Sequence, residues 1–161
     1  MQFLVTALLV ICADQCTKYL VAEQMDLYES FAVVPGFCNL TFVTNNGAAF
    51  SLFAGQPGMW RQVFFISVVC IALVILVIAH RSYSRSHAMY AWAFGLIAGG
   101  AVGNLIDRIR LGHVVDFIDI YIGRFHWPAF NGADSAITGG VFLFLFINIF
   151  LEREQRKGTK H

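Results

Sequence analysis

Hydrophobic residues form four long runs along the chain, and polar residues gather in the segments between them. A helix needs about 20 predominantly apolar residues to cross the hydrocarbon core of a bilayer. Four stretches meet this requirement, at approximately residues 2–22, 61–79, 88–107 and 134–151. The pattern therefore predicts four transmembrane helices in a single integral membrane domain that spans residues 1–161.

The connecting segments differ in their charge. The short segment 80–87 holds Arg81 and Arg85, and four basic residues follow Leu151, whereas segment 23–60 has no lysine or arginine. Cytoplasmic loops of membrane proteins carry an excess of these two residues. We therefore expect both termini and segment 80–87 in the cytoplasm, with segments 23–60 and 108–133 on the outer side.

The long outer segment 23–60 is predicted to contain a β element. Residues 37–44 read F-C-N-L-T-F-V-T, a partly alternating run rich in β-branched and aromatic residues, which is typical of a strand. The fold class is thus an all-α membrane protein with a small extracytoplasmic β element resting on the membrane. The phenylalanines of this segment are expected to face lipid or a ligand: Phe31, Phe37, Phe42, Phe50 and Phe53.

Composition supports the membrane class. Hydrophobic residues make up 58% of the chain and charged residues 13%, where a soluble domain has about 25% charged residues. A net charge of +1 indicates no nucleic-acid partner. The four cysteines form no C-x-x-C pair, so neither a zinc site nor a disulfide framework is predicted. Because Asp14 and Lys18 interrupt the first apolar run, we expect a retained helix there rather than a cleaved signal peptide.

The segment 103–135 carries an unusual concentration of acids for so apolar a chain. Carboxylates at a membrane edge are costly, and they indicate a functional site. Two nearby carboxyl groups share one proton, so the ionised one can activate water while the protonated one protonates a leaving amine. Asp116 lies inside an apolar run and Asp134 begins the last helix, which favours this pair. The acids and amides of the segment are Asn104, Asp107, Asp116, Asp119, Asn131 and Asp134.

Several of these groups also allow a purely structural interpretation. Asp14 and Lys18, four residues apart, allow two interpretations. They are either an ion pair that tolerates lipid, or an acid bonded to backbone near the active site and a lysine that meets phospholipid or substrate headgroups. Asp107 and Arg108 are either positioning residues or a pair that joins the third helix to the next loop. Asp134 alone could be a helix cap.

Glycines and histidines complete the picture. Gly95, Gly99 and Gly103 form a small-residue stripe that predicts close helix packing. The chain has no H-E-x-x-H or G-x-S-x-G motif, and its histidines lack ligand spacing, so we expect no metal, no other cofactor and no serine nucleophile. His113 is interpreted as an interfacial residue rather than a catalytic base.

Five motifs in register resemble those of bacterial lipoprotein signal peptidase, also called signal peptidase II, of aspartic peptidase family A8. They are Asp14-Gln-x-Thr-Lys18, Asn45-x-Gly-Ala-Ala-Phe50, Gly99-Gly100-Ala-x-Gly-Asn104-x-x-Asp107-Arg108, Val114-Val115-Asp116-Phe117 and Phe130-Asn131-x-Ala133-Asp134-Ser135. The resemblance implies an inner-membrane endopeptidase that cleaves prolipoproteins before the lipid-modified cysteine, after diacylglyceryl transfer.

The resemblance also implies roles for individual residues. Asp116 and Asp134 would be the catalytic dyad, and segment 23–60 would clamp the substrate. The residues expected to position the dyad, the substrate or the local structure are Asp14, Lys18, Asn45, Gly100, Asn104, Asp107, Arg108, Asn131 and Ala133. The expected partners are a lipid-modified prolipoprotein and membrane phospholipid, and the enzyme is expected to be a monomer. Two rival interpretations are a small transporter or channel subunit and a non-enzymatic assembly protein.

Overall fold

Four helices and a small sheet make up the computed structural model, which describes residues 1–47, 59–84 and 87–151. The helices are α1 (Gln2–Gln24), α2 (Met59–Tyr83), α3 (Met89–Leu111) and α4 (Gly132–Phe146), and a π-helical turn, η2 (Ile147–Leu151), continues α4. Four candidate spans are long and apolar enough to cross a membrane in this part of the chain. The predicted fold class is confirmed, although α2 and α3 extend several residues beyond the predicted helices.

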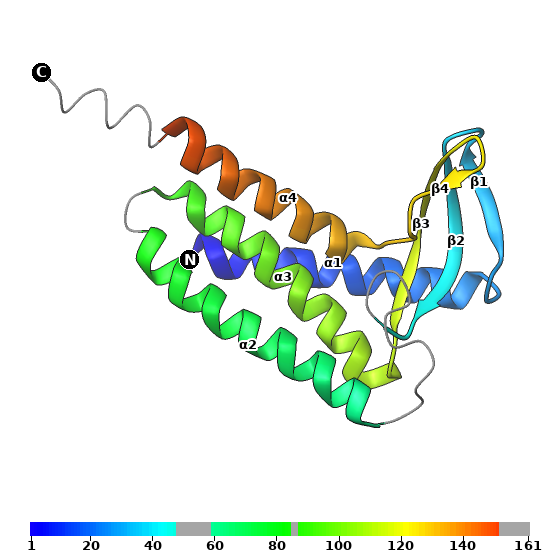
Figure 1. Cartoon of the computed structure of the whole chain (residues 1–161), viewed down its shortest axis with the longest axis horizontal. Coiled ribbons are helices and arrows are strands. Elements are labelled where there is room, and N and C mark those ends of the chain that lie inside the picture. The colour runs from blue at the N-terminus through cyan, green and yellow to red at the C-terminus, as the bar shows by residue number, and fades with distance from the viewer. Residues whose placement is uncertain (48–58, 85–86, 152–161) are drawn as a thin grey trace, which may run out of the picture.

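The sheet lies at one end of the helices (Figure 1). Its strands are β1 (Ser30–Val34), β2 (Cys38–Asn45), β3 (Val114–Ile122) and β4 (Phe125–His126), antiparallel in the order β1-β2-β3-β4. β2 corresponds to the strand predicted at 37–44. The β element is thus built from both segments that were predicted to lie on the outer side, because β3 and β4 come from residues 108–133.

Helix α3 is the centre of the bundle and packs against α1, α2 and α4. A methyl group added at Gly99 would lie 2.8 Å from the carbonyl oxygen of Ala7 in α1. On a second face of α3, a methyl group at Gly100 would collide with the carbonyl oxygen of Ala133 in α4. The predicted glycine stripe therefore allows close approach to α1, and Gly100 extends the same device to α4.

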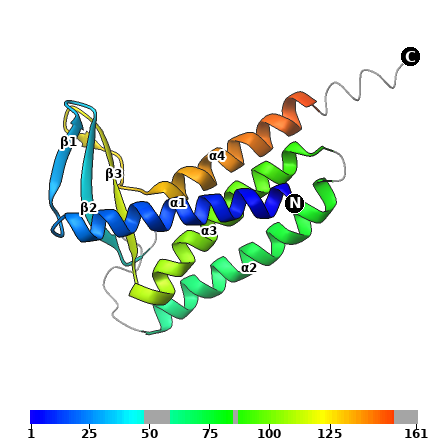
Figure 2. The same ribbon diagram turned by 180° about the vertical axis from the view of Figure 1, so that it is seen from behind.

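Two apolar clusters lie at opposite ends of the bundle. One joins Val21 and Met25 of α1 to Val115 and Phe117 of β3, so it fixes β3 across the helix ends. The other gathers around Tyr90 at the far end. The start of α1 and the end of η2 also lie at that far end, as the view from behind shows (Figure 2). Buried polar residues fill the space beneath β3.

Some of the predicted features lie outside the described residues. These are Phe50 and Phe53, the Ala48–Phe50 part of the second motif, Arg85, and the basic residues after Leu151.

Candidate active site

Asp116 lies on β3 and is 2% exposed. Its Oδ1 accepts a hydrogen bond of 2.6 Å from the side-chain amide of Asn131, and its Oδ2 accepts one of 3.1 Å from that of Asn45. Burial and, to a smaller extent, the nearby charge of Asp134 together raise the pKa of Asp116 to about 6, against the opposing effect of the two amides and of the Lys18 charge. Asp116 thus holds a proton far more readily than an ordinary aspartate.

Asp134 lies in the first turn of α4, where Asn131 is the N-cap. The two residues form a capping box: the Asn131 side chain accepts from the Asp134 backbone N–H at 3.0 Å, and Asp134 Oδ2 accepts from the Asn131 backbone N–H at 3.3 Å. Asp134 Oδ1 also accepts from the Asn104 amide at 2.8 Å. The capping role foreseen for Asp134 is therefore real, and the same carboxyl group faces a cavity.

Asn131 connects the two acids. Its fully buried amide nitrogen donates to Asp116, to Asn104 Oδ1 at 3.2 Å and to the Val115 carbonyl at 3.2 Å, while its oxygen binds the backbone of Asp134. A single side chain therefore holds β3 to the start of α4. Asn104 forms a second link between these elements, since it contacts both Asn131 and Asp134.

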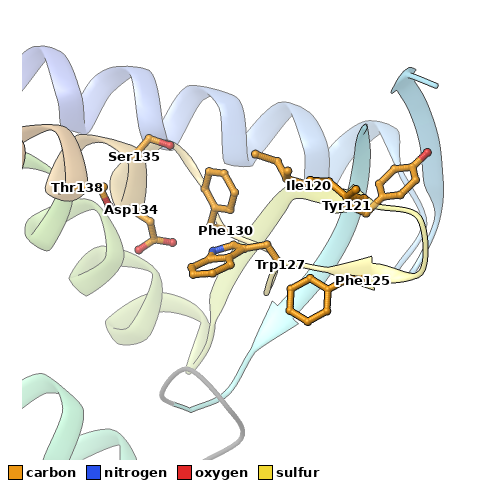
Figure 3. Close-up of a pocket in the computed structure, with 9 residues that line it drawn as sticks. Ile120, Tyr121, Phe125, Trp127, Phe130, Asp134, Ser135 and Thr138 are labelled. Atoms are coloured by element: carbon orange, nitrogen blue, oxygen red, sulfur yellow. The ribbon is translucent and has the colours of Figure 1, made fainter. Parts of the chain in front are cut away.

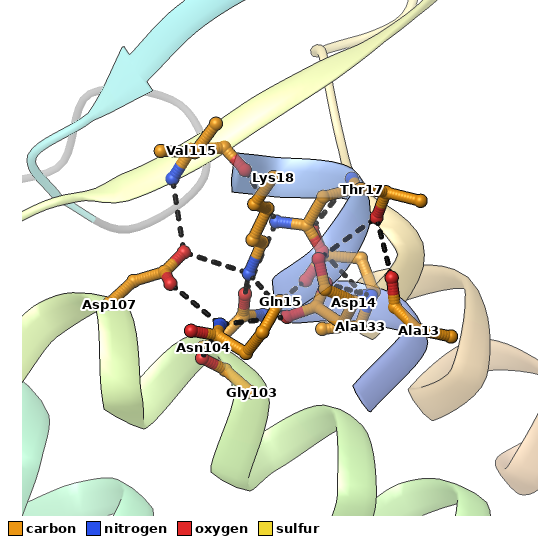
Figure 4. A network of polar contacts seen from close by, with 12 residues as sticks. Ala13, Asp14, Gln15, Thr17, Lys18, Gly103, Asn104, Asp107, Val115 and Ala133 are labelled. Carbon is orange, nitrogen blue, oxygen red and sulfur yellow. Dashed lines mark hydrogen bonds and ion pairs between the residues drawn. The ribbon is translucent and has the colours of Figure 1, made fainter. Parts of the chain in front are cut away.

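Lys18 lies behind Asn104 in a buried network (Figure 4). Its ammonium is 2.8 Å from Asp14 Oδ2, from Asp107 Oδ2 and from Asn104 Oδ1. These three acceptors match its three N–H donors. Because the Lys18 ammonium is buried among them, it does not face lipid headgroups.

The contacts of Asn104 determine its orientation. Its oxygen accepts from both Lys18 and Asn131, so its amide nitrogen faces Asp134. Lys18 thereby reaches Asp134 through one intervening amide.

Asp14 holds the start of α4 from the side of α1. Its Oδ1 accepts from the Ala133 backbone N–H at 2.8 Å, as one interpretation of the sequence expected. Gly103 leaves room for this carboxyl group, because a methyl group there would lie 2.5 Å from Asp14 Oδ2. Ala133 is itself fully buried.

Gln15 is a polar residue of the network that sequence reasoning missed. Its side-chain nitrogen donates to Asp107 Oδ1 at 2.8 Å, to the Gly103 carbonyl at 3.2 Å and to Asp14 Oδ2 at 3.3 Å. The available signal was its place inside the motif Asp14-Gln-x-Thr-Lys18.

Asp107 and Arg108 form no ion pair with each other in the described part of the chain, and Asp107 alone makes the link from α3 to the following segment. Adjacent helical residues point in different directions. Asp107 turns toward α1, where it meets Lys18, and it also accepts from the Val115 backbone N–H at 3.3 Å. Arg108 turns toward α2, with its guanidinium 5.6 Å from the centre of the Phe65 ring and Nη1 donating to the Asn104 carbonyl at 3.2 Å.

The remaining candidates, Asp119 and His113, lie toward the two ends of β3. Asp119 contacts Asn39 and His126 at the other end of the strand, and among the described residues no hydrogen bond or ion pair joins it to the dyad. His113 precedes β3 and is partly buried.

A cavity of about 690 Å³ opens beside Asp134 (Figure 3). Aromatic and aliphatic side chains from residues 120–130 line one side, and α4 contributes Asp134, Ser135 and Thr138. Among the described residues, no group of three histidine, cysteine or acidic side chains could hold a metal ion. The geometry therefore combines two linked carboxyl groups with an adjoining apolar cavity, an arrangement suited to acid–base chemistry on a partly hydrophobic substrate.

A family model described as signal peptidase (SPase) II matches residues 6–150. The chain belongs to the signal peptidase II family. The lipoprotein signal peptidase of Syntrophus aciditrophicus (strain SB) is 46% identical over 154 residues, which are 96% of this chain and 95% of that protein. The lipoprotein signal peptidase of Geobacter metallireducens (strain ATCC 53774 / DSM 7210 / GS-15) is 46% identical over 144 residues, or 89% and 88% of the two chains.

Solved structures agree with this assignment. A bacterial membrane enzyme solved by the in meso method at 1.9 Å resolution superposes with a TM-score of 0.81, at 37% identity and 92% coverage of each chain. A second, at 2.3 Å resolution, has a TM-score of 0.79 and covers 99% of this chain and 93% of that one. As a signal peptidase II, the chain is a membrane aspartic peptidase that processes lipoprotein precursors, and the transporter and assembly-protein interpretations are set aside.

Proposed function

We propose that Asp116 and Asp134 are the catalytic dyad that hydrolyses the precursor. The observation that carries this proposal is the amide of Asn131, which contacts both acids and joins their two secondary-structure elements. Asp134 also lines the cavity, where a peptide bond and a water molecule can reach it.

The dyad works by sharing one proton. The raised pKa of Asp116, about 6, favours retention of the proton on this buried member of the pair. The ionised carboxylate then draws a proton from the attacking water, and the protonated one delivers its proton to the leaving amine. No metal or other cofactor is required for this reaction.

The residues around the two acids position the dyad. Lys18 orients Asn104, which donates to Asp134, and Asp14 holds the backbone of Ala133 next to it. Asn45 supports Asp116 from β2. Gly100 permits the close contact of α3 with the start of α4, and Asp107 ties Lys18 to β3. Arg108, on the neighbouring face of α3, is assigned to the substrate backbone.

The cavity beside Asp134 is assigned to the lipid-modified segment of the precursor. Its walls are mainly apolar, and α4, which lines one side, has exposed Val141, Phe142 and Leu145 that phospholipid would cover. A diacylglyceryl group held in this region would orient the peptide bond before the modified cysteine. Binding of a remote group in this way lowers the entropic part of the barrier.

The orientation of the enzyme follows from its charges. Arg81 lies at the end of α2 far from the sheet, the same end as the start of α1 and the end of η2. By the positive-inside rule this end faces the cytoplasm and the dyad lies near the outer face of the bacterial inner membrane. We assign a monomer, since the site is completed by residues of one chain.

The test is an activity assay with purified enzyme in detergent micelles and a diacylglyceryl-modified precursor. Asp116→Asn and Asp134→Asn are each expected to lower kcat by about 10³-fold or more, because each removes one half of the proton exchange. Asp26→Asn, the same change at an exposed aspartate beyond α1, serves as the matched control and should leave kcat unchanged. Substantial activity in either dyad variant, with normal thermal unfolding, would refute the assignment.

A further inference from the structure

β3 carries two acids, Asp116 and Asp119. Asp119 is not part of the proposed dyad, and it contacts His126 instead. The histidine Nδ1 lies 2.8 Å from Asp119 Oδ1 and 3.1 Å from Oδ2. On the other side, Asn39 of β2 donates to Asp119 Oδ2 at 3.0 Å. Because a carboxylate only accepts hydrogen bonds, Nδ1 of His126 carries the hydrogen in this contact. The contact therefore forms with either a neutral or a charged imidazole.

This contact closes a hairpin that has little backbone support. β4 is only two residues long and pairs with the end of β3 through Tyr121 and Ile122. Beyond these two pairs, the backbone bond next to β4 is that of the Trp127 N–H to the Ile120 carbonyl at 2.8 Å. The His126 ring also stacks on the Tyr121 ring, with centroids 4.9 Å apart and planes inclined by 11°. Side chains therefore supply much of what holds β4 in place.

The hairpin carries one wall of the cavity beside the dyad. Ile122, Phe125 and Trp127 line it, although these side chains are 75%, 75% and 60% exposed. In the close-up, Trp127 lies between Phe125 and Phe130, and Asp134 lies beyond Phe130 (Figure 3). Residues with so little packing of their own depend on the hairpin backbone for their position.

The base of the hairpin is held separately. The backbone of Phe130 accepts from Phe117 at 3.0 Å and from Ile118 at 2.8 Å, and it donates to Ile118 at 3.1 Å. These bonds lie between the hairpin and Asn131. Loosening the outer hairpin therefore leaves the dyad geometry in place, so substrate binding and the chemical step can be separated by experiment.

We propose that Asp119 and His126 are positioning residues whose hydrogen bond holds the β3–β4 hairpin, so that its aromatic wall grips the apolar part of the precursor. This inference rests on the proposed function, since it takes the cavity as the substrate site. The two acids of β3 thus have different roles. Asp116 takes part in hydrolysis, and Asp119 supports substrate binding.

The variants Asp119→Ala and His126→Ala test this proposal on the diacylglyceryl-modified precursor in micelles. Each is expected to raise KM by about three- to five-fold, the effect of one partly exposed charged hydrogen bond, with kcat within about two-fold of wild type. The double variant should raise KM by clearly less than the product of the two single effects, because the Asp119–His126 contact is common to both. The Asn39 bond and the Tyr121 stacking are lost in one single variant each. Asp119→Asn, which keeps an acceptor for His126, should restore most of the affinity.

A control variant and a hydrogen-exchange measurement test whether the effect on KM comes from the hairpin. Ser30→Ala removes another side-chain hydrogen bond of the sheet, to Thr41 at 2.7 Å, far from the hairpin, and should change neither constant. Amide hydrogen exchange at Trp127, whose N–H donates to the Ile120 carbonyl at 2.8 Å, should accelerate in both alanine variants. If Asp119→Ala fails to fold, His126→Ala removes the same contact from its exposed side.

An unchanged KM in the alanine variants would overturn the proposal, and so would effects that add in the double variant or a fall in kcat alone. None of these outcomes bears on the dyad, which depends on Asp116→Asn and Asp134→Asn. Conversely, activity in the dyad variants would remove the proposed function even if the hairpin variants raised KM.

Discussion

Removal of the buried ammonium of Lys18 is the most demanding test of the network behind the dyad. Lys18→Met keeps an unbranched apolar side chain and deletes the charge. It leaves Asp14 and Asp107, which are 1% and 4% exposed, without their cation. Breaking a buried ion pair by removing one partner costs about 3–5 kcal/mol.

The structure places the expected cost at the lower end of that range. Asp14 retains the N–H of Ala133, and Asp107 retains the N–H of Val115 and the amide of Gln15. These donors still form hydrogen bonds to the two carboxylates. The total cost is therefore smaller than twice the cost of breaking one buried ion pair. At roughly 3 °C per kcal/mol for a chain of this size, a loss of about 3 kcal/mol lowers Tm by about 10 °C.

Thermal unfolding in detergent micelles, followed by circular dichroism, measures this shift. Glu23→Gln removes an exposed charge from the same helix and should change Tm by no more than about 2 °C. Adding Asp107→Asn to Lys18→Met removes one uncompensated carboxylate and should recover about half of the loss. A Tm of Lys18→Met within about 2 °C of wild type, or a double variant less stable than the single one, would refute the reasoning.

Two other predictions concern the dyad and its support. The raised pKa of Asp116 means that the dyad keeps its proton below about pH 6 and loses it above, so kcat/KM should fall as the pH rises through this value. Asn45→Ala removes a hydrogen bond that favours the ionised form of Asp116, and it should move this limb of the pH profile to higher pH; a limb that stays in place or moves down would contradict the assignment. Gly100→Ala forces α3 away from Ala133 and should cost about 1–3 kcal/mol of stability together with most of the activity. Gly139→Ala, where an added methyl group meets nothing within 4 Å, should retain both; equal losses in the two variants, measured by unfolding and precursor cleavage, would contradict the argument.

The helices were predictable because a bilayer imposes both length and apolarity on them. Asp14 and Lys18 did not obscure α1, since their spacing of four residues already indicated an ion pair. β2 was readable from its own alternating pattern. In each case the signal lies within one continuous stretch, and no knowledge of a distant partner is needed.

Features that depend on two distant segments were missed. β3 reads V-V-D-F-I-D-I-Y-I, and its four first residues are all buried, so its pattern does not separate the two faces of a strand. Its pairing with β2, in which Asp116 lies opposite Val43, becomes visible only in three dimensions. The contacts of Lys18 with α3 likewise depend on the close approach of α1 and α3 at Gly99.

The kind of partner that each acid receives separates structural from catalytic carboxylates at this site. Asp14 and Asp107 share the ammonium of Lys18, whose three donors are then fully used. The hydrogen bonds that Asp116 and Asp134 accept in the described part of the chain come from amide groups. Neutral donors compensate a buried charge less completely than a cation does, so a shared proton is the remaining way to accommodate two adjacent acids. The charges of Lys18 and Arg108 act on the dyad through space, without a hydrogen bond to either acid in the described part of the chain, so the two acids still favour the single proton on which the proposed hydrolysis depends.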